Sequence, residues 1–200
     1  MLRLRGYVIT LCVCYLIDFL LNMILSLCGV YNFSVFFAFW YSLLITLTLF
    51  LLDVIAASLC RLIPKKKINI HSKIYKTFGF EKAFYERLGI RWWKNKIPEL
   101  GGKLEGFSKS NISGDSPEYF EMFIKLSITG EITHHFCILL SVVTFFIFSS
   151  FILTFTLPLF LVNVYFNILP VFVQRYNRPK LYKIYLKKIE KNEEITLWKI

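Results

Sequence analysis

Glu131 and His134 are candidate catalytic residues because they stand three positions apart, with His135 directly after them. Side chains at positions i and i+3 share one face of a helix, so Glu131 could accept a hydrogen bond from the His134 ring. Such a bond holds one tautomer and leaves the other ring nitrogen as a general base. The alternative is a solvated polar helix end. The Glu-x-x-His spacing also occurs at di-metal sites, but these need a second copy of the motif, so no metal is expected.

A second candidate site lies in residues 91–98, where basic side chains adjoin two tryptophans. Arg91, Trp93 and Lys94 could clamp the phosphates of an anionic substrate at a membrane surface. The same residue types also form simple interfacial anchors, because tryptophan lies at the level of the lipid headgroups and Lys and Arg reach the phosphates. The residues alone favour the anchor, and substrate binding is the competing hypothesis.

The third candidate site is a polar string that follows a long apolar segment. It consists of Gln174, Arg175, Tyr176, Asn177 and Arg178. A helix that leaves a membrane usually ends in Lys or Arg, so the arginines alone need no further explanation. The amides are less expected there, and with the guanidinium groups they suit a phosphate or a carboxylate. We therefore expect Gln174, Arg175, Asn177 and Arg178 to bind substrate.

Other polar residues lie inside apolar segments. Asn163 and Asn167 are one helical turn apart and should face protein rather than lipid. Ionisable residues in such segments are candidates for a functional site. However, Asp53 is close enough to the end of its segment to reach water, and Asp18 could bond to Asn22. Both aspartates are therefore left outside the predicted site.

The elements that must position these residues cross a membrane. Of the 200 residues, 56% are hydrophobic, and the mean hydropathy is +0.56. A soluble protein of this size has too little interior for so much apolar surface. One charge, Asp53, occurs between Phe36 and Ile55, and none occurs between Phe136 and Gln174. A span needs about 20 residues, so the second window is long enough for two.

The charge distribution predicts the orientation of these spans. The formal net charge is +11, and Lys and Arg are concentrated in residues 61–103 and 175–191. Next to spanning segments, such clusters indicate anionic lipid rather than nucleic acid, and they mark the cytoplasmic side. Both termini are therefore expected in the cytoplasm. The five cysteines show no CxxC spacing, so neither a disulfide nor a zinc site is expected.

We predict an all-α integral membrane protein with about four transmembrane helices and an amphipathic cytoplasmic helical layer. Residues 1–60 would form a two-helix membrane hairpin and residues 61–135 a cytoplasmic interfacial helical region. Residues 136–174 would form a second membrane hairpin, and residues 175–200 a basic cytoplasmic tail.

The expected boundaries follow from apolar runs and turn residues. The first two spans are expected at about 7–27 and 33–59. The third should end near Phe155, with a break near Pro158 before the fourth. A further helix should begin at Pro117, because proline is favoured in a first helical turn. Loops are expected at 101–102 and 108–116.

The three candidate sites, in this order, resemble the glycosyl-4,4'-diaponeurosporenoate acyltransferase family over roughly residues 70–190. The resemblance rests on Arg91-x-Trp93-Lys94-x-Lys96, Glu131-x-x-His134, the stretch from Lys76 to Lys82, and the string Gln174-Arg175-Tyr176-Asn177-Arg178-Pro179-Lys180-Leu181. The last string is the most specific of these. The chain differs from the family in two places. It has two N-terminal spans where the family's pigment enzyme looks to have one, and its insertion at residues 100–116 is different.

The resemblance implies transfer of a fatty acyl group to a glucose hydroxyl of a glycosylated C30 carotenoid acid. In that reaction His134 would take the hydroxyl proton and Glu131 would hold the imidazole. Arg175, Arg178 and Arg91 would hold the donor's phosphates or the developing oxyanion. Acyl transfer at a membrane is better supported than this particular acceptor.

The expected enzyme is a multi-pass cell-membrane O-acyltransferase that works without a cofactor. Its partners would be membrane lipids, a glycosylated isoprenoid acceptor and an acyl donor, with an acyl thioester as co-substrate. No nucleic acid is expected, and the oligomeric state is left open. The alternative function is a non-catalytic membrane scaffold that organises lipids or pathway enzymes.

Overall fold

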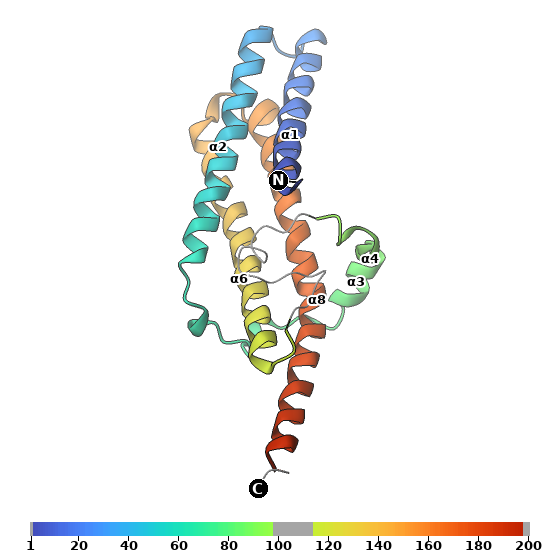
Figure 1. Cartoon of the computed structure of the whole chain (residues 1–200). Coiled ribbons are helices and arrows are strands. Elements are labelled where there is room, and N and C mark those ends of the chain that lie inside the picture. Colours follow the sequence, from blue (N-terminus) through green and yellow to red (C-terminus); the bar gives the residue numbers. More distant parts are fainter. Residues whose placement is uncertain (1, 98–113, 198–200) are drawn as a thin grey trace. The chain divides into compact units, whose positions relative to one another are not determined.

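The computed structural model describes residues 2–97 and 114–197, and every regular element in this part of the chain is helical. The elements, in chain order, are α1 (Leu2–Leu27), α2 (Val35–Arg61), η1 (Lys65–Lys67), η2 (Lys73–Tyr75), α3 (Glu81–Arg87), α4 (Ile90–Trp93), α6 (Pro117–Ser141), α7 (Val143–Ile147), η3 (Ser149–Phe151), η4 (Ile152–Thr156) and α8 (Leu157–Leu197) (Figure 1). Of the loops expected from the sequence, residues 101–102 and 108–113 lie outside the described residues.

Four helical segments are long and apolar enough to cross a membrane. They are Val8–Leu27, Val35–Arg61, Pro117–Ile147 and Ser149–Lys191. The prediction of an all-α membrane protein with four spanning helices is therefore confirmed. The predicted helix start at Pro117 is also confirmed.

The chain divides into two compact units. The first comprises Met1–Leu59 and His134–Ile168, and the second comprises Cys60–Thr133 and Leu169–Ile200. Two long helices, α6 and α8, contribute residues to both units. Each unit has its own hydrophobic core, so each is described by itself.

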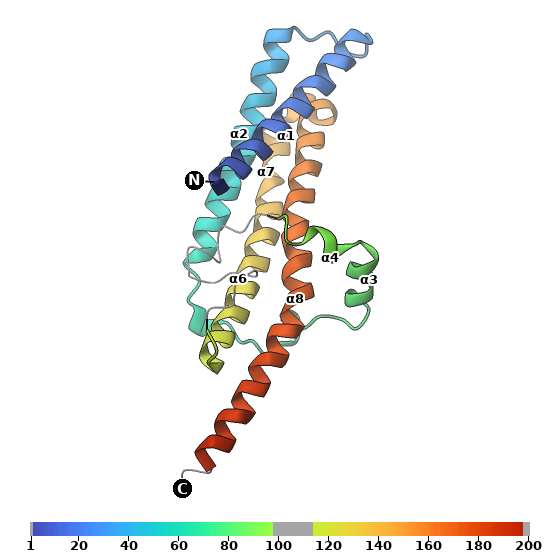
Figure 2. The same ribbon diagram turned by 45° about the vertical axis from the view of Figure 1, so that its right-hand side comes forward.

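In the first unit, α1 and α2 form a hairpin closed by a short turn (Figure 2). The Val30 N–H donates to the Leu25 carbonyl and the Gly29 N–H to that of Ser26, both at 3.0 Å. This pattern satisfies carbonyl groups that the helix end leaves open. It requires a left-handed residue, and Gly29 supplies one with φ 73°. The hydroxyl of Ser26 also donates to the Phe33 carbonyl at 3.1 Å, which joins the two sides of the turn.

An aromatic cluster forms much of this unit's core. Phe37 and Tyr41 on α2 contact Phe151 and Phe155, with edge-to-face ring centroids 5.0–6.1 Å apart. Edge-to-face pairs place the positive rim of one ring against the negative face of another, which adds to the gain from burial. The cluster thereby packs the irregular segment 148–156 against α2.

The break between the third and fourth spans precedes Pro158 instead of occurring at it. Helix α6 ends at Ser141, residues 142–156 form short irregular helical pieces, and α8 begins at Leu157. Pro158 is therefore in the first turn of α8, where a missing N–H costs no helical hydrogen bond. Pro158 therefore belongs to the start of α8, and in the sequence it indicates where the break between the two spans ends.

Polar side chains satisfy part of the backbone in this irregular segment. The Thr144 hydroxyl donates to the Ser141 carbonyl at 2.6 Å, and the Thr156 hydroxyl donates to the Phe148 carbonyl at 3.0 Å. The amide of Asn22 donates to the Thr154 carbonyl at 3.0 Å. Such partners are needed because a bilayer offers no water to an open backbone group.

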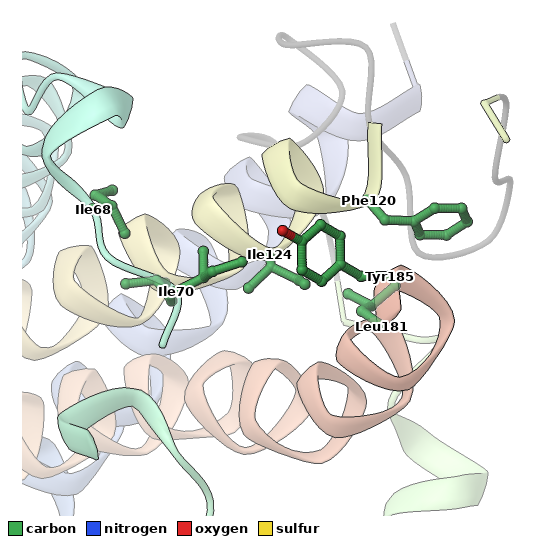
Figure 3. Packing of buried hydrophobic residues seen from close by; sticks show 7 residues of the cluster. Ile68, Ile70, Phe120, Ile124, Leu181 and Tyr185 are labelled. Atoms are coloured by element: carbon green, nitrogen blue, oxygen red, sulfur yellow. The ribbon is translucent and has the colours of Figure 1, made fainter. Parts of the chain in front are cut away.

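In the second unit, α6 and α8 enclose a core together with the segment that follows α2. Figure 3 shows Ile68 and Ile70 of that segment beside Ile124 of α6 and Leu181 and Tyr185 of α8. The helices α3 and α4 make a second, smaller core with α8. It is formed by Tyr85, Ile90, Val173 and Tyr176.

Helix α8 is longer than the hydrocarbon core of a membrane is thick. Its 41 residues correspond to about 60 Å, roughly twice the thickness of a bilayer's hydrocarbon core. It continues past Pro170 and Pro179 without a break, so the basic segment after Gln174 is helical as far as Leu197. The polar string 174–178 is thus presented on a regular helix.

Candidate functional site

Arg175 is the centre of a buried ion-pair network in the second unit. Its Nε and Nη2 donate to the two carboxylate oxygens of Glu81 at 2.8 and 2.5 Å. Its Nη1 donates to Glu131 Oε1 at 2.7 Å. The side chains of Arg175, Glu81 and Glu131 are 14%, 8% and 10% exposed. The guanidinium fork matches the carboxylate of Glu81 atom for atom, which makes this a strong, directional pair.

Arg178 completes this network from the next turn of α8. Its Nη2 donates to the second oxygen of Glu131 at 2.5 Å, and its Nη1 donates to the Tyr75 carbonyl at 3.0 Å. Glu131 therefore bridges two guanidinium groups, one on each oxygen. We call the set of Glu81, Glu131, Arg175 and Arg178 the paired network, and its two positive and two negative charges cancel.

Glu81 was not among the predicted site residues. It opens α3, where it accepts from the Phe78 N–H at 2.8 Å and from the Tyr85 hydroxyl at 2.6 Å. Burial raises the pKa of Glu81, but the hydrogen bonds from Arg175, Tyr85 and Phe78 outweigh it and lower the pKa to about 2. Burial and the Glu81 carboxylate raise the pKa of Tyr85, so its hydroxyl remains a donor. The sequence signal was an acidic residue in a first helical turn, which is common.

A second group of charges surrounds the Tyr176 ring. The Tyr176 hydroxyl donates to Glu86 at 3.2 Å, and Arg91 pairs with the same carboxylate at 2.7 Å. The ammonium groups of Lys94 and Lys180 lie 5.1 and 4.9 Å from the ring centroid, within the range of a cation–π interaction. We call Glu86, Arg91, Lys94, Tyr176 and Lys180 the basic rim, because three cations face one carboxylate.

The structure brings two further predicted residues to the basic rim. Lys94 Nζ donates to Asn177 Oδ1 at 3.2 Å. Burial, together with the positive charges of Lys180 and Arg91, lowers the pKa of Lys94. The Trp93 indole donates to the Leu88 carbonyl at 2.9 Å, which fixes its ring in the turn between α3 and α4.

Gln174 lies against the backbone of α6 instead of at the basic rim. A Cβ atom at Gly130 would stand 2.4 Å from Gln174 Nε2, so any side chain at this position would make the end of Gln174 shift. Gln174 Oε1 is buried and has no hydrogen-bond partner among the described residues.

His134 belongs to the first unit, and its partner is not the predicted one. Its Nδ1 lies 2.9 Å from Asn167 Oδ1. Asn167 in turn donates from Nδ2 to the carbonyl and the side-chain oxygen of Asn163, at 3.1 and 3.0 Å. The predicted hydrogen bond from His134 to Glu131 is thus replaced, because Glu131 binds two guanidinium groups. A carboxylate bonds more strongly to such cations than to a neutral imidazole.

The two aspartates left outside the predicted site have different surroundings. Asp53 lies close to the side chains of Asn163, Asn167 and Cys137, so it belongs to the same polar cluster as His134. The Asp18 carboxylate accepts from the Ser42 hydroxyl at 2.7 Å, and the bond with Asn22 is made by the main-chain carbonyl of Asp18 instead of its carboxylate. We call Asp53, His134, Asn163 and Asn167 the histidine cluster.

Comparison with known proteins identifies the family. A family model described as glycosyl-4,4'-diaponeurosporenoate acyltransferase matches residues 71–187, more than half of the chain. The match includes the paired network, the basic rim, and all of the histidine cluster except Asp53. A comparison with curated proteins found no match, and neither did a comparison with solved structures. The chain therefore belongs to the glycosyl-4,4'-diaponeurosporenoate acyltransferase family, and it is a membrane acyltransferase of carotenoid biosynthesis.

Proposed function

We propose that the chain transfers a fatty acyl group from a thioester donor to a hydroxyl of a glycosylated isoprenoid or carotenoid lipid. The observation that carries the proposal is the histidine cluster, in which a half-buried histidine is hydrogen-bonded through one ring nitrogen. A histidine held in this way is suited to act as a general base. The acceptor suggested by the family's name is a glycosyl-diaponeurosporenoate.

The proposed step is direct transfer without an acyl-enzyme. The acceptor's hydroxyl oxygen bonds to the thioester carbonyl carbon while the hydroxyl proton moves to Nε2 of His134. The tetrahedral intermediate then breaks its C–S bond, and the leaving thiolate takes the proton back from the imidazolium. Neither a metal nor a further cofactor is needed for this balance.

We assign the donor's phosphates to the basic rim. The paired network has no net charge to offer an anion, because Glu81 and Glu131 already occupy Arg175 and Arg178. In the basic rim, Arg91 is 71% exposed and lysines outnumber carboxylates. Of the predicted substrate-binding residues, Arg91, Lys94 and Asn177 therefore retain that role, with Trp93 supporting the turn that carries them. We propose that Arg175 and Arg178 instead hold the helices of the second unit together through their ion pairs, and that Gln174 packs against Gly130 of α6.

Mass spectrometry of membrane lipids tests the activity. Cells that make the acceptor should gain one lipid, heavier by a single acyl group, when they also express the chain. His134→Ala should lower its formation by about 10²- to 10⁴-fold, the usual contribution of acid–base catalysis. His135→Ala is the matched control, since this neighbouring side chain is exposed, and it should be nearly as active as wild type.

Two outcomes would change the proposal. An acylated lipid formed at the wild-type rate by His134→Ala would remove the general base. Absence of any acylated lipid, with wild-type protein present at a normal level, would favour the non-catalytic scaffold that organises lipids or pathway enzymes.

The proposed location is the cell membrane with both termini in the cytoplasm, as the Lys and Arg clusters indicate. Cysteines introduced near Asn32 and Leu157 should then react with an impermeant thiol reagent added outside the cell. Cysteines near Ser110 and Asn192 should not react, and external labelling at Ser110 would overturn this orientation.

A further inference from the structure

The histidine cluster defines which nitrogen of His134 carries a proton. We propose that Asn167 is a positioning residue that holds His134 in the Nδ1–H tautomer and leaves Nε2 as the basic atom. The tautomer follows from hydrogen bonds alone. Its consequence for catalysis rests on the proposed function, in which His134 takes the proton of the acceptor hydroxyl.

The orientation of the Asn167 amide is the first step. One of its terminal atoms lies 3.1 Å from the main-chain carbonyl oxygen of Asn163. A carbonyl oxygen accepts and never donates, so the atom that faces it must be the NH₂ nitrogen of Asn167. The identity of the two amide ends is therefore fixed by the hydrogen bond to the Asn163 carbonyl.

The tautomer of His134 follows from this orientation. If Nδ2 of Asn167 faces Asn163, then Oδ1 is the atom that lies 2.9 Å from His134 Nδ1. An amide oxygen can only accept, so Nδ1 must carry the hydrogen. A neutral imidazole has a single N–H, which leaves the lone pair of Nε2 unprotonated and available to a substrate proton.

Burial keeps this arrangement in place. Asn167 is 6% exposed, and its Nδ2 also faces the side-chain oxygen of Asn163 at 3.0 Å. Turning the amide by 180° would place its NH₂ against the imidazole and its oxygen against the Asn163 carbonyl. That loses the two hydrogen bonds to Asn163 and places two oxygen acceptors against each other at a buried position.

Nuclear magnetic resonance of the ring nitrogens tests the tautomer without any substrate. The full-length chain, labelled with ¹⁵N-histidine and reconstituted in lipid nanodiscs, would carry His71→Gln and His135→Gln so that His134 is the remaining histidine. At a pH where the ring is neutral, we expect the proton on Nδ1. Asn167→Ala should move the population toward Nε2–H, and Asn167→Asp should retain Nδ1–H because its carboxylate still accepts.

A matched control distinguishes the main-chain carbonyl of Asn163 from its side-chain oxygen as the acceptor that orients Asn167. Asn163→Ala keeps the main-chain carbonyl that orients Asn167, so His134 should remain Nδ1–H. A wild-type signal with the proton on Nε2, or an Asn167→Ala variant that keeps Nδ1–H, would overturn the inference. If Asn167→Ala does not fold, the spectra of wild type and of Asn167→Asp still test the tautomer of His134.

The lipid assay distinguishes this inference from the proposed function. Asn167→Ala should lower acyl transfer at least about tenfold, and the loss can approach about 10⁴-fold where a histidine base is held in the wrong tautomer. Asn167→Asp should restore most of the activity. If Asn167→Ala changes the tautomer but acylates lipid at the wild-type rate, the positioning stands while His134 is not the base.

Discussion

The paired network and the histidine cluster use polar residues in opposite ways. In the paired network, two guanidinium groups and two carboxylates neutralise one another at 2.5–2.8 Å. In the histidine cluster, a single amide contacts the imidazole: Asn167 Oδ1 lies 2.9 Å from Nδ1 of His134, and the other ring nitrogen does not bond to Asn167. Side chains that saturate each other hold helices in place, whereas a base must keep one atom for its substrate. For this reason we propose that the paired network stabilises the fold and that the histidine cluster carries the chemistry.

The largest effect on stability is expected when the central arginine of the paired network is removed. Arg175→Gln would leave the carboxylates of Glu81 and Glu131 buried with fewer partners, and breaking a buried ion pair costs about 3–5 kcal/mol. Thermal unfolding of the purified chain in detergent, followed by circular dichroism, should show a large loss of stability or no folded protein. His134→Ala should unfold like wild type. The opposite result, a stable Arg175→Gln enzyme with a raised KM for its donor, would return Arg175 to substrate binding.

A milder change separates charge from geometry in the same network. Arg178→Lys keeps the positive charge near Glu131 but cannot also donate to the Tyr75 carbonyl as Nη1 does at 3.0 Å. We expect a loss of about 1–2 kcal/mol in unfolding free energy, the effect of an unsatisfied buried group. The KM for a long-chain acyl-coenzyme A should stay unchanged. A raised KM at undiminished stability would instead favour direct contact between Arg178 and the donor.

The pH dependence of stability tests whether the charge of Glu81 stabilises the fold. Because the native pKa of Glu81 is lowered to about 2, its ionised form is stabilised by folding. That contribution is complete above the ordinary glutamate value of about 4.3, and it is lost as the pH falls toward 2. Melting temperatures of wild type and Glu81→Gln should therefore differ most near neutral pH and converge in acid. A constant difference across this range would show that the carboxylate's charge contributes nothing.

The smallest expected effect concerns the basic rim. Lys94→Gln combined with Lys180→Gln should raise the KM for acyl-coenzyme A several-fold and leave kcat and stability nearly unchanged, since Lys180 is exposed and Lys94 is only half-buried. The effect should fade as added salt shortens the Debye length from about 10 Å at 0.1 M to about 3 Å at 1 M. Lys66→Gln, a basic residue remote in sequence from the rim, is the control. A KM unaffected at low salt would leave the rim as a membrane anchor.

Local sequence signals were sufficient for the fold class. The apolar windows predicted four spanning helices, and the structure has four that are long enough. The motifs at residues 91–96, 131–134 and 174–181 predicted the family, which matches residues 71–187. Both succeed because hydropathy and motif spacing are properties of consecutive residues, so they can be read without knowing how the helices pack.

The choice of partners was decided only by the tertiary structure. Sequence spacing favoured Glu131 as the partner of His134, but Asn167, 33 positions away, takes that place. Arg175 pairs with Glu81, which is 94 positions away in the sequence. Helical periodicity shows which residues share a face, but it does not show which of several compatible groups on other segments will come nearest. Charge-assisted bonds are stronger than a bond to a neutral imidazole, so Glu131 bonds to two guanidinium groups and His134 bonds to the neutral amide of Asn167.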